Sequence, residues 1–146
     1  MRRPPRRPDT PVLTRAATLW ALVQGMAVLI ICSGALFGGV AVGMPERDLR
    51  SFVFTTLVLM NFGLIMVNRS FHSSLREAVF RRNPALWALA GAVTAVLAVA
   101  LYWPPAQNLF RFGPLHWDDL AICAAIGLTV IAAMELAKGL FLRIQQ

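Results

Sequence analysis

Long apolar stretches separated by short polar connections dominate the pattern of this 146-residue sequence. An apolar run of about 18 residues or more is long enough to cross a bilayer as a helix. Four such spans are expected, at approximately residues 17–43, 52–68, 85–103 and 120–142. The pattern therefore predicts an all-α membrane protein, in which a four-helix transmembrane domain (17–146) follows a short arm (1–16).

The second span is the most informative, because it carries an amide near its middle. No charged residue occurs between Arg50 and Arg69, yet Asn61 lies at mid-depth. Lipid offers an amide no hydrogen bond, so Asn61 needs a partner inside the protein or a wet cavity. One hypothesis is a hydrogen bond to a neighbouring helix. The other is a cation ligand, since an amide carbonyl is a hard oxygen donor suited to Ca²⁺.

Three further polar residues within spans are candidates for function. Gln24 lies near the start of the first span, and we expect it at the membrane interface, with a ligand role as the alternative. Glu135 is the only acid well inside a span, and Lys138 follows one helical turn later. We expect these two charges to pair while Lys138 reaches toward the interface; a proton relay is the alternative.

Small residues in the first span suggest close helix packing. Gly34 and Gly38 form a G-x-x-x-G pair, which lets a neighbouring helix approach closely. We expect this pair to pack against another helix of the same bundle. The alternative is a dimer interface.

Composition excludes an ordinary soluble domain. Of the residues, 58% are hydrophobic and 14% are charged, against about a quarter charged in soluble domains. The formal net charge of +7 comes mainly from arginines beside the apolar runs, where they indicate topology and lipid-headgroup contacts. We therefore expect membrane lipids, and no nucleic acid, as partners. Cys32 and Cys123 lie inside apolar runs and are expected to be small buried hydrophobes.

Positive charges beside the spans predict the topology. The arm, counted to Arg15, holds five arginines and the second connection holds four, whereas the third connection holds only Arg111. Basic sides of membrane proteins face the cytoplasm, so both termini should be cytoplasmic, in a multi-pass protein of a bacterial plasma membrane. Prolines exclude a regular helix in the arm, which should run along the membrane surface. They stand at positions 4, 5, 8 and 11.

Aromatic residues bracket the third span. Trp87 lies at one end, and Tyr102 with Trp103 lies at the other, as in the interfacial belts of membrane proteins. Pro104 and Pro105 then break the helix. We expect the segment that follows to form a hairpin loop lying on the membrane.

Catalytic motifs do not occur in the sequence. None of its aspartates begins an Asp-Lys-Thr-Gly motif, no glycine-rich phosphate loop is present, and no nucleophile has a base set beside it. His72 and His116 lie far apart, without metal-ligand spacing. We expect no enzyme activity from this chain by itself and no bound cofactor. A metal cation enters only as an ion to be transported.

Two stretches resemble a known family. The opening MRRPPRRPDTPVL looks like the M-x-R-P-P-R-x-P segment that follows the sixth membrane helix in cation-transporting P-type ATPases of the calcium and sodium/potassium pump type. LRSFVFTTLVLMNFGLIMVNRS resembles the A-R-T/S-x-x-F-x-x-L-V eighth helix of those pumps. The Asn-Pro before Ala85 and the proline break after Trp103 recur around their ninth helix.

This resemblance implies that the four spans are helices seven to ten of a pump, its C-terminal helical bundle. Matched through Arg50 and Val58, Asn61 falls where calcium pumps of the sarcoplasmic-reticulum type have a glutamate ligand. An amide there resembles pumps with a single cation site. The main family ligands, on the fourth to sixth helices, have no counterpart in this sequence.

The sequence thus predicts a support domain for the transport helices of a cation pump, acting only with the remaining membrane and cytoplasmic domains. The resemblance implies a pump of the calcium type. Two alternatives stay open. One is an independent small four-helix transporter or channel, with Asn61, Gln24 and Glu135 along its path. The other is a regulatory subunit bound to a complete pump.

Overall fold

The computed structural model describes residues 15–69 and 84–144, and all regular structure in these two ranges is helical. The helices are α1 (Arg15–Ala41), α2 (Glu46–Arg69), α4 (Pro84–Tyr102), α5 (Pro104–Phe110) and α6 (Trp117–Ile144). All of them except α5 are long and apolar enough to cross a membrane. The prediction of an all-α protein with four membrane-spanning helices is confirmed.

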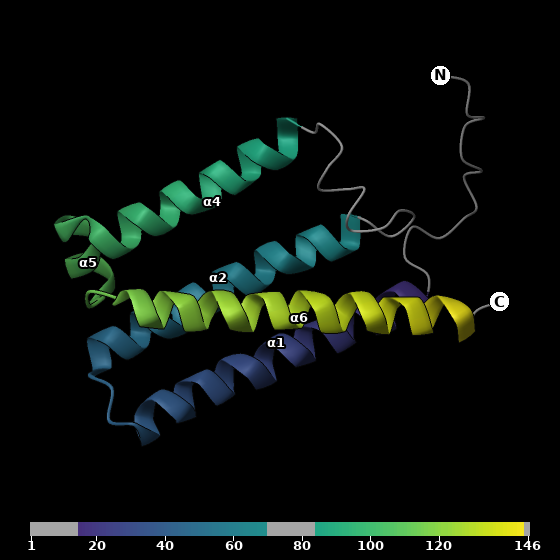
Figure 1. Cartoon of the computed structure of the whole chain (residues 1–146), viewed down its shortest axis with the longest axis horizontal. Coiled ribbons are helices and arrows are strands. Elements are labelled where there is room, and N and C mark those ends of the chain that lie inside the picture. The colour runs from purple at the N-terminus through teal and green to yellow at the C-terminus, as the bar shows by residue number, and fades with distance from the viewer. Residues whose placement is uncertain (1–14, 70–83, 145–146) are drawn as a thin grey trace.

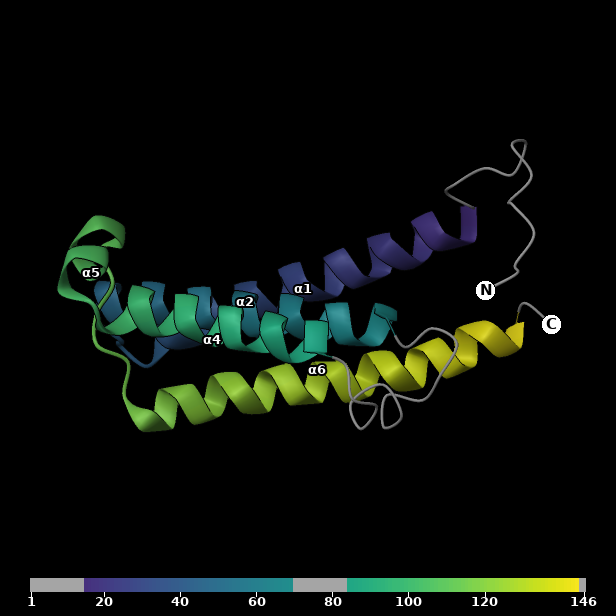
Figure 2. The same ribbon diagram turned by 90° about the horizontal axis from the view of Figure 1, so that it is seen from above.

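Helix α2 lies at the centre of the bundle. It packs most extensively against α6, then against α1, and only slightly against α4. Figures 1 and 2 show α1, α2 and α6 running side by side, whereas α4 meets α2 near α5 and diverges toward its own start. The start of α1 and the end of α6 lie at the same end of the bundle (Figure 1). The α1–α2 turn and α5 lie at the opposite end.

The core is an apolar seam between α2 and α6, to which α1 adds side chains. Its largest cluster combines Met60 and Val67 of α2 with Val130 and Met134 of α6. A second cluster, nearer the start of α6, contains Phe52 and the fully buried Cys123. The expectation that Cys123 is a small buried hydrophobe therefore fits its surroundings.

Glycines mark the closest helix contacts, but they are not the predicted pair. Gly34 and Gly38 have no described atom within 4 Å of the position that a β-carbon would take. A β-carbon on Gly39 would instead overlap Leu49, and one on Gly63 would overlap Ile131 of α6. The G-x-x-x-G pair is thus not used between the helices described here, because α1 turns Gly39 rather than that pair toward α2.

The second helix begins at Glu46, earlier than the expected position 52. The connection is short because α1 ends at Ala41 and Gly43 takes a left-handed conformation (φ +73°), which glycine adopts without strain. The carbonyl of Pro45 accepts the first helical hydrogen bond, from Leu49 N–H at 2.9 Å. Glu46 lies in the first turn, where the helix dipole favours negative charge. Most of the charged connection is therefore helical.

The expected hairpin loop after α4 contains the short helix α5. Trp103 precedes it in an extended conformation, and prolines occupy its first turn, where a missing N–H costs nothing. Gln107 ties the corner together: its Nε2 donates to the Leu101 carbonyl, and its own carbonyl accepts from Phe112 N–H at 2.9 Å. This corner places Phe112 against Phe54 of α2, with ring centroids 5.0 Å apart.

Replacing Gly63 by valine should destabilise the domain, because the added side chain meets Ile131 where α2 and α6 touch. We expect a loss of about 1–3 kcal/mol in the free energy of unfolding, the usual cost of overpacking. Thermal unfolding of the purified domain in detergent would measure it. Gly91→Val is the matched control, since a β-carbon at Gly91 of α4 meets no described atom within 4 Å. Equal losses in both variants would contradict the packing described.

Candidate functional site

One face of α2 is left uncovered by the other described helices. Leu57, Asn61 and Ile65 are all exposed and lie four residues apart, on the side of α2 away from the α6 seam. Residues at this spacing share one face of a helix. We call Leu57, Asn61 and Ile65 the outward stripe. It is the surface on which the candidate cation ligand lies.

Asn61 makes only a local hydrogen bond. Its Nδ2 donates to the carbonyl oxygen of Leu57, one turn earlier on the same helix, at 2.9 Å. Its Oδ1 accepts no hydrogen bond from any residue in the described ranges. Among the described residues, Asn61 therefore has no hydrogen bond to another helix. Its side chain is exposed.

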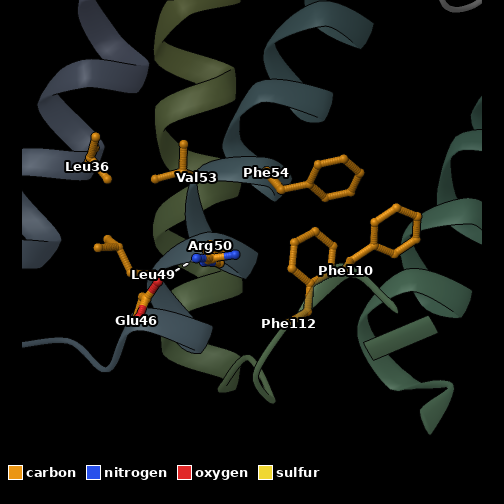
Figure 3. A pocket seen from close by; sticks show the side chains of 8 residues that line it. All are labelled: Leu36, Glu46, Leu49, Arg50, Val53, Phe54, Phe110 and Phe112. Atoms are coloured by element: carbon orange, nitrogen blue, oxygen red, sulfur yellow. Dashed lines mark hydrogen bonds and ion pairs between the residues drawn. The ribbon is translucent and has the colours of Figure 1, made fainter. Parts of the chain in front are cut away.

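A hollow of about 520 Å³ lies beside the first turns of α2, toward the α1–α2 turn. Figure 3 shows its lining: Leu36, Glu46, Leu49, Arg50, Val53, Phe54, Phe110 and Phe112. The walls are mostly apolar, and the polar members pair with each other, Arg50 Nη2 lying 2.5 Å from Glu46 Oε1. The two residues of this ion pair are exposed and lie one helical turn apart, so the pair contributes little to stability. The hollow is shaped to receive apolar side chains.

Gln24 lies in the contact between α1 and α2. It is 4% exposed, and its amide pairs reciprocally with Asn68 of α2. Gln24 Nε2 donates to Asn68 Oδ1 at 2.9 Å, and Asn68 Nδ2 donates to Gln24 Oε1 at 3.0 Å. Helix α1 turns Gln24 toward α2, and its depth relative to the membrane interface stays a prediction. Two amides placed face to face satisfy each other, which removes most of the reason to assign Gln24 a ligand.

Glu135 and Lys138 both lie on α6. Glu135 is half-buried and takes part in an interaction. The side chain of Lys138 lies outside what the structure describes, so the pairing of these two residues stays a prediction. Asn61 shares no hydrogen bond with Glu135 or Gln24. The structure thus does not bring the three intramembrane polar residues together.

Sequence reasoning missed a polar contact at the start of α2. Ser51 is fully buried, and its Oγ donates to the Gly113 carbonyl at 2.9 Å and accepts from Gly113 N–H at 3.0 Å. The same N–H lies 3.0 Å from the carbonyl oxygen of Arg47. A β-carbon on Gly113 would overlap Asp48, so only glycine fits there. The Gly-Pro pair at 113–114 signalled a turn, but no spacing rule links it to Ser51.

A second missed contact joins α2 to α6. Thr56 is fully buried; its Oγ1 lies 2.9 Å from the Phe52 carbonyl and 3.3 Å from Cys123 Sγ. Cys123 is a free thiol, as is Cys32. No group of three or more histidine, cysteine or acidic side chains that could hold a metal ion occurs in the residues described.

Breaking the amide pair by Gln24→Leu should loosen the contact between α1 and α2. We expect a loss of about 0.6 kcal/mol, and at most about 2 kcal/mol, as measured for hydrogen bonds between membrane helices. Asn68→Leu should cost a similar amount, and the double variant should cost less than the sum, because both remove one interaction. Unfolding of the parent and the three variants in detergent would test this. Additive losses would show that the two amides act independently.

Comparison with known proteins adds to this geometry. The family model described as "Cation transporting ATPase, C-terminus" matches residues 1–140. The calcium-transporting ATPase type 2C member 2 of Mus musculus is 30% identical over 143 residues, which is 94% of this chain and 15% of the mouse protein. The chain therefore spans 15% of the length of the curated relative it matches.

Proposed function

Since this chain belongs to the C-terminal domain family of cation-transporting P-type ATPases, we propose that it supports the transport helices of such a pump and acts together with the rest of it. The chain is a multi-pass membrane domain with four spanning helices. A motif for phosphorylation or nucleotide binding does not occur in its sequence. We propose that ATP hydrolysis resides in the remaining domains of the pump and that this domain braces the membrane part.

The outward position of Asn61 carries the proposal. An amide at mid-depth that bonds only to its own helix would face lipid if the four helices stood alone. Packing of further helices against the outward stripe removes this cost and brings Asn61 Oδ1 next to the ion pathway. The unfilled G-x-x-x-G pair of α1, Gly34 and Gly38, supports the same conclusion, because it offers close approach to a helix from elsewhere.

Calcium is the cation that we propose. The mouse relative is named a calcium-transporting ATPase. A neutral amide oxygen is a hard donor of the kind that Ca²⁺ uses alongside carboxylates. In this proposal Asn61 contributes one oxygen, and the carboxylate ligands come from helices of the rest of the pump.

The cytoplasmic location of both termini remains a prediction, as does the bacterial membrane, since the relative described above is a mouse protein. Support for the topology comes from the fold: the start of α1 and the end of α6 lie at one end of the bundle (Figure 1). That end carries Arg15. An independent channel is less well supported, because Gln24 is occupied by Asn68 and shares no polar contact with Asn61.

Co-expression tests whether the domain needs the rest of a pump. We expect it to co-purify with a cation-transporting ATPase polypeptide that ends after its sixth membrane helix. ATP-driven uptake of ⁴⁵Ca²⁺ into proteoliposomes should require both polypeptides. Ca²⁺ flux through liposomes that hold this chain alone, abolished by Asn61→Leu, would instead establish the independent channel.

The variant Asn61→Leu tests the cation role within the assembled pump. We expect the Ca²⁺ concentration for half-maximal transport to rise about tenfold, equivalent to about 1.4 kcal/mol, within the range for a lost polar contact to a charge. Thr129→Val is the control, because its Oγ1 bonds only to the Ala125 carbonyl of its own helix, at 2.8 Å. An unchanged half-maximal concentration in Asn61→Leu would remove Asn61 from the cation site.

A further inference from the structure

The contact between Ser51 and Gly113 joins α2 to a segment far from it in the sequence, and it can therefore do more than stabilise the fold. Ser51 lies on α2, and Gly113 lies on the segment between α5 and α6. We propose that Ser51 and Gly113 are positioning residues, whose hydrogen bonds set the axial position of α2 relative to the segment between α5 and α6 and so place the Asn61 oxygen for the cation. This inference rests on the proposed cation role of Asn61.

The contact is directional and tightly enclosed. Ser51 is fully buried; its Oγ accepts from Gly113 N–H at 3.0 Å, and its one hydroxyl hydrogen is shared between the Gly113 carbonyl at 2.9 Å and the Arg47 carbonyl at 3.1 Å. The Gly113 N–H also lies 3.0 Å from the Arg47 carbonyl, so one peptide group touches two successive turns of α2. Because a β-carbon on Gly113 would overlap Asp48, the segment lies directly on the helix backbone. An axial shift of α2 would break these contacts together.

Apolar packing elsewhere along α2 fixes the axial position of the helix less precisely. Met60, Val67, Val130 and Met134 form the main cluster through their apolar side chains, and apolar packing is not directional. Lipid chains are as apolar as these side chains, so burial alone provides little force between membrane helices. Packing selects which helices touch, whereas hydrogen bonds at 2.9–3.0 Å fix how they are aligned.

A helix transmits this alignment along its length. Asn61 lies ten residues after Ser51 on the uninterrupted helix α2, which corresponds to about 15 Å along the axis. A change in the height of α2 at Ser51 therefore moves the Asn61 oxygen by a similar distance. Small misplacements of a liganding group weaken its interactions strongly.

The segment of Gly113 also ties α2 to the corner formed by α4 and α5. Phe112 packs on Phe54 of α2, with ring centroids 5.0 Å apart, and on Phe110 of α5, at 5.4 Å. Thr56, one turn beyond Phe52, adds a weaker contact to Cys123 of α6 at 3.3 Å. The Ser51–Gly113 contact is thus the polar centre of the junction among α2, α5 and the start of α6.

The test uses the assembled pump with ⁴⁵Ca²⁺ uptake in proteoliposomes. We expect Ser51→Ala and Gly113→Ala each to raise the half-maximal Ca²⁺ concentration at least about threefold, with the maximal rate per assembled pump within about twofold of the parent. Ser51→Ala should add no further increase when Asn61 is already leucine. Thr94→Val is the control, since its hydroxyl bonds only to Ala90 O at 2.9 Å in its own helix.

The outcomes separate this inference from the proposed function. If Asn61→Leu shifts the half-maximal concentration but Ser51→Ala lowers only yield or maximal rate, Ser51 is purely structural and the inference fails alone. A shift from Ser51→Ala that persists in full beside Asn61→Leu would also overturn it, because Ser51 would then act independently of Asn61. No effect of Asn61→Leu removes the premise and overturns both. Should Gly113→Ala fail to assemble, Ser51→Ala decides the question.

Discussion

Close packing of α2 against α6 organises this membrane domain, and it depends on two places where a side chain is missing. Gly63 lets Ile131 approach the backbone of α2, and Gly113 lets the segment before α6 lie on the first turns of α2. In a bilayer, burial of apolar surface contributes little to helix association, so close approach and hydrogen bonds carry more of it. Helix α1 completes the bundle, and α4 joins it mainly at the corner near α5.

Polar contacts are distributed unevenly along α2. Ser51 and Thr56 bond near its start, and Asn68 pairs with Gln24 near its end. Between them Asn61 makes no hydrogen bond to another described helix. Helix α2 is hydrogen-bonded to other segments near both ends and exposed near its middle. Its middle is therefore available for packing against another part of a protein. This arrangement is compatible with the proposed role of a brace in a larger pump.

Two features of the surface of the described helices leave room for further packing. The domain family is the C-terminal part of cation-transporting ATPases, and the chain spans 15% of the mouse relative. The apolar hollow beside Phe54 and the open glycine pair of α1 are surfaces that further helices can fill. Where no further helix packs, lipid chains can cover the hollow and the glycine pair, because lipid is as apolar as a helix surface.

The sequence by itself determined the number of membrane helices and the family, because hydropathy and the motifs around Arg3 and Arg50 are local properties. It also singled out Asn61, since an amide in an apolar run is conspicuous without any knowledge of neighbours. Only the tertiary structure decided which way each helix faces. It turned Gln24 toward Asn68, and it used Gly39 and Gly63 for close contacts instead of Gly34 and Gly38. These choices depend on pairings between residues far apart in the chain, such as Ser51 with Gly113, which no local pattern encodes.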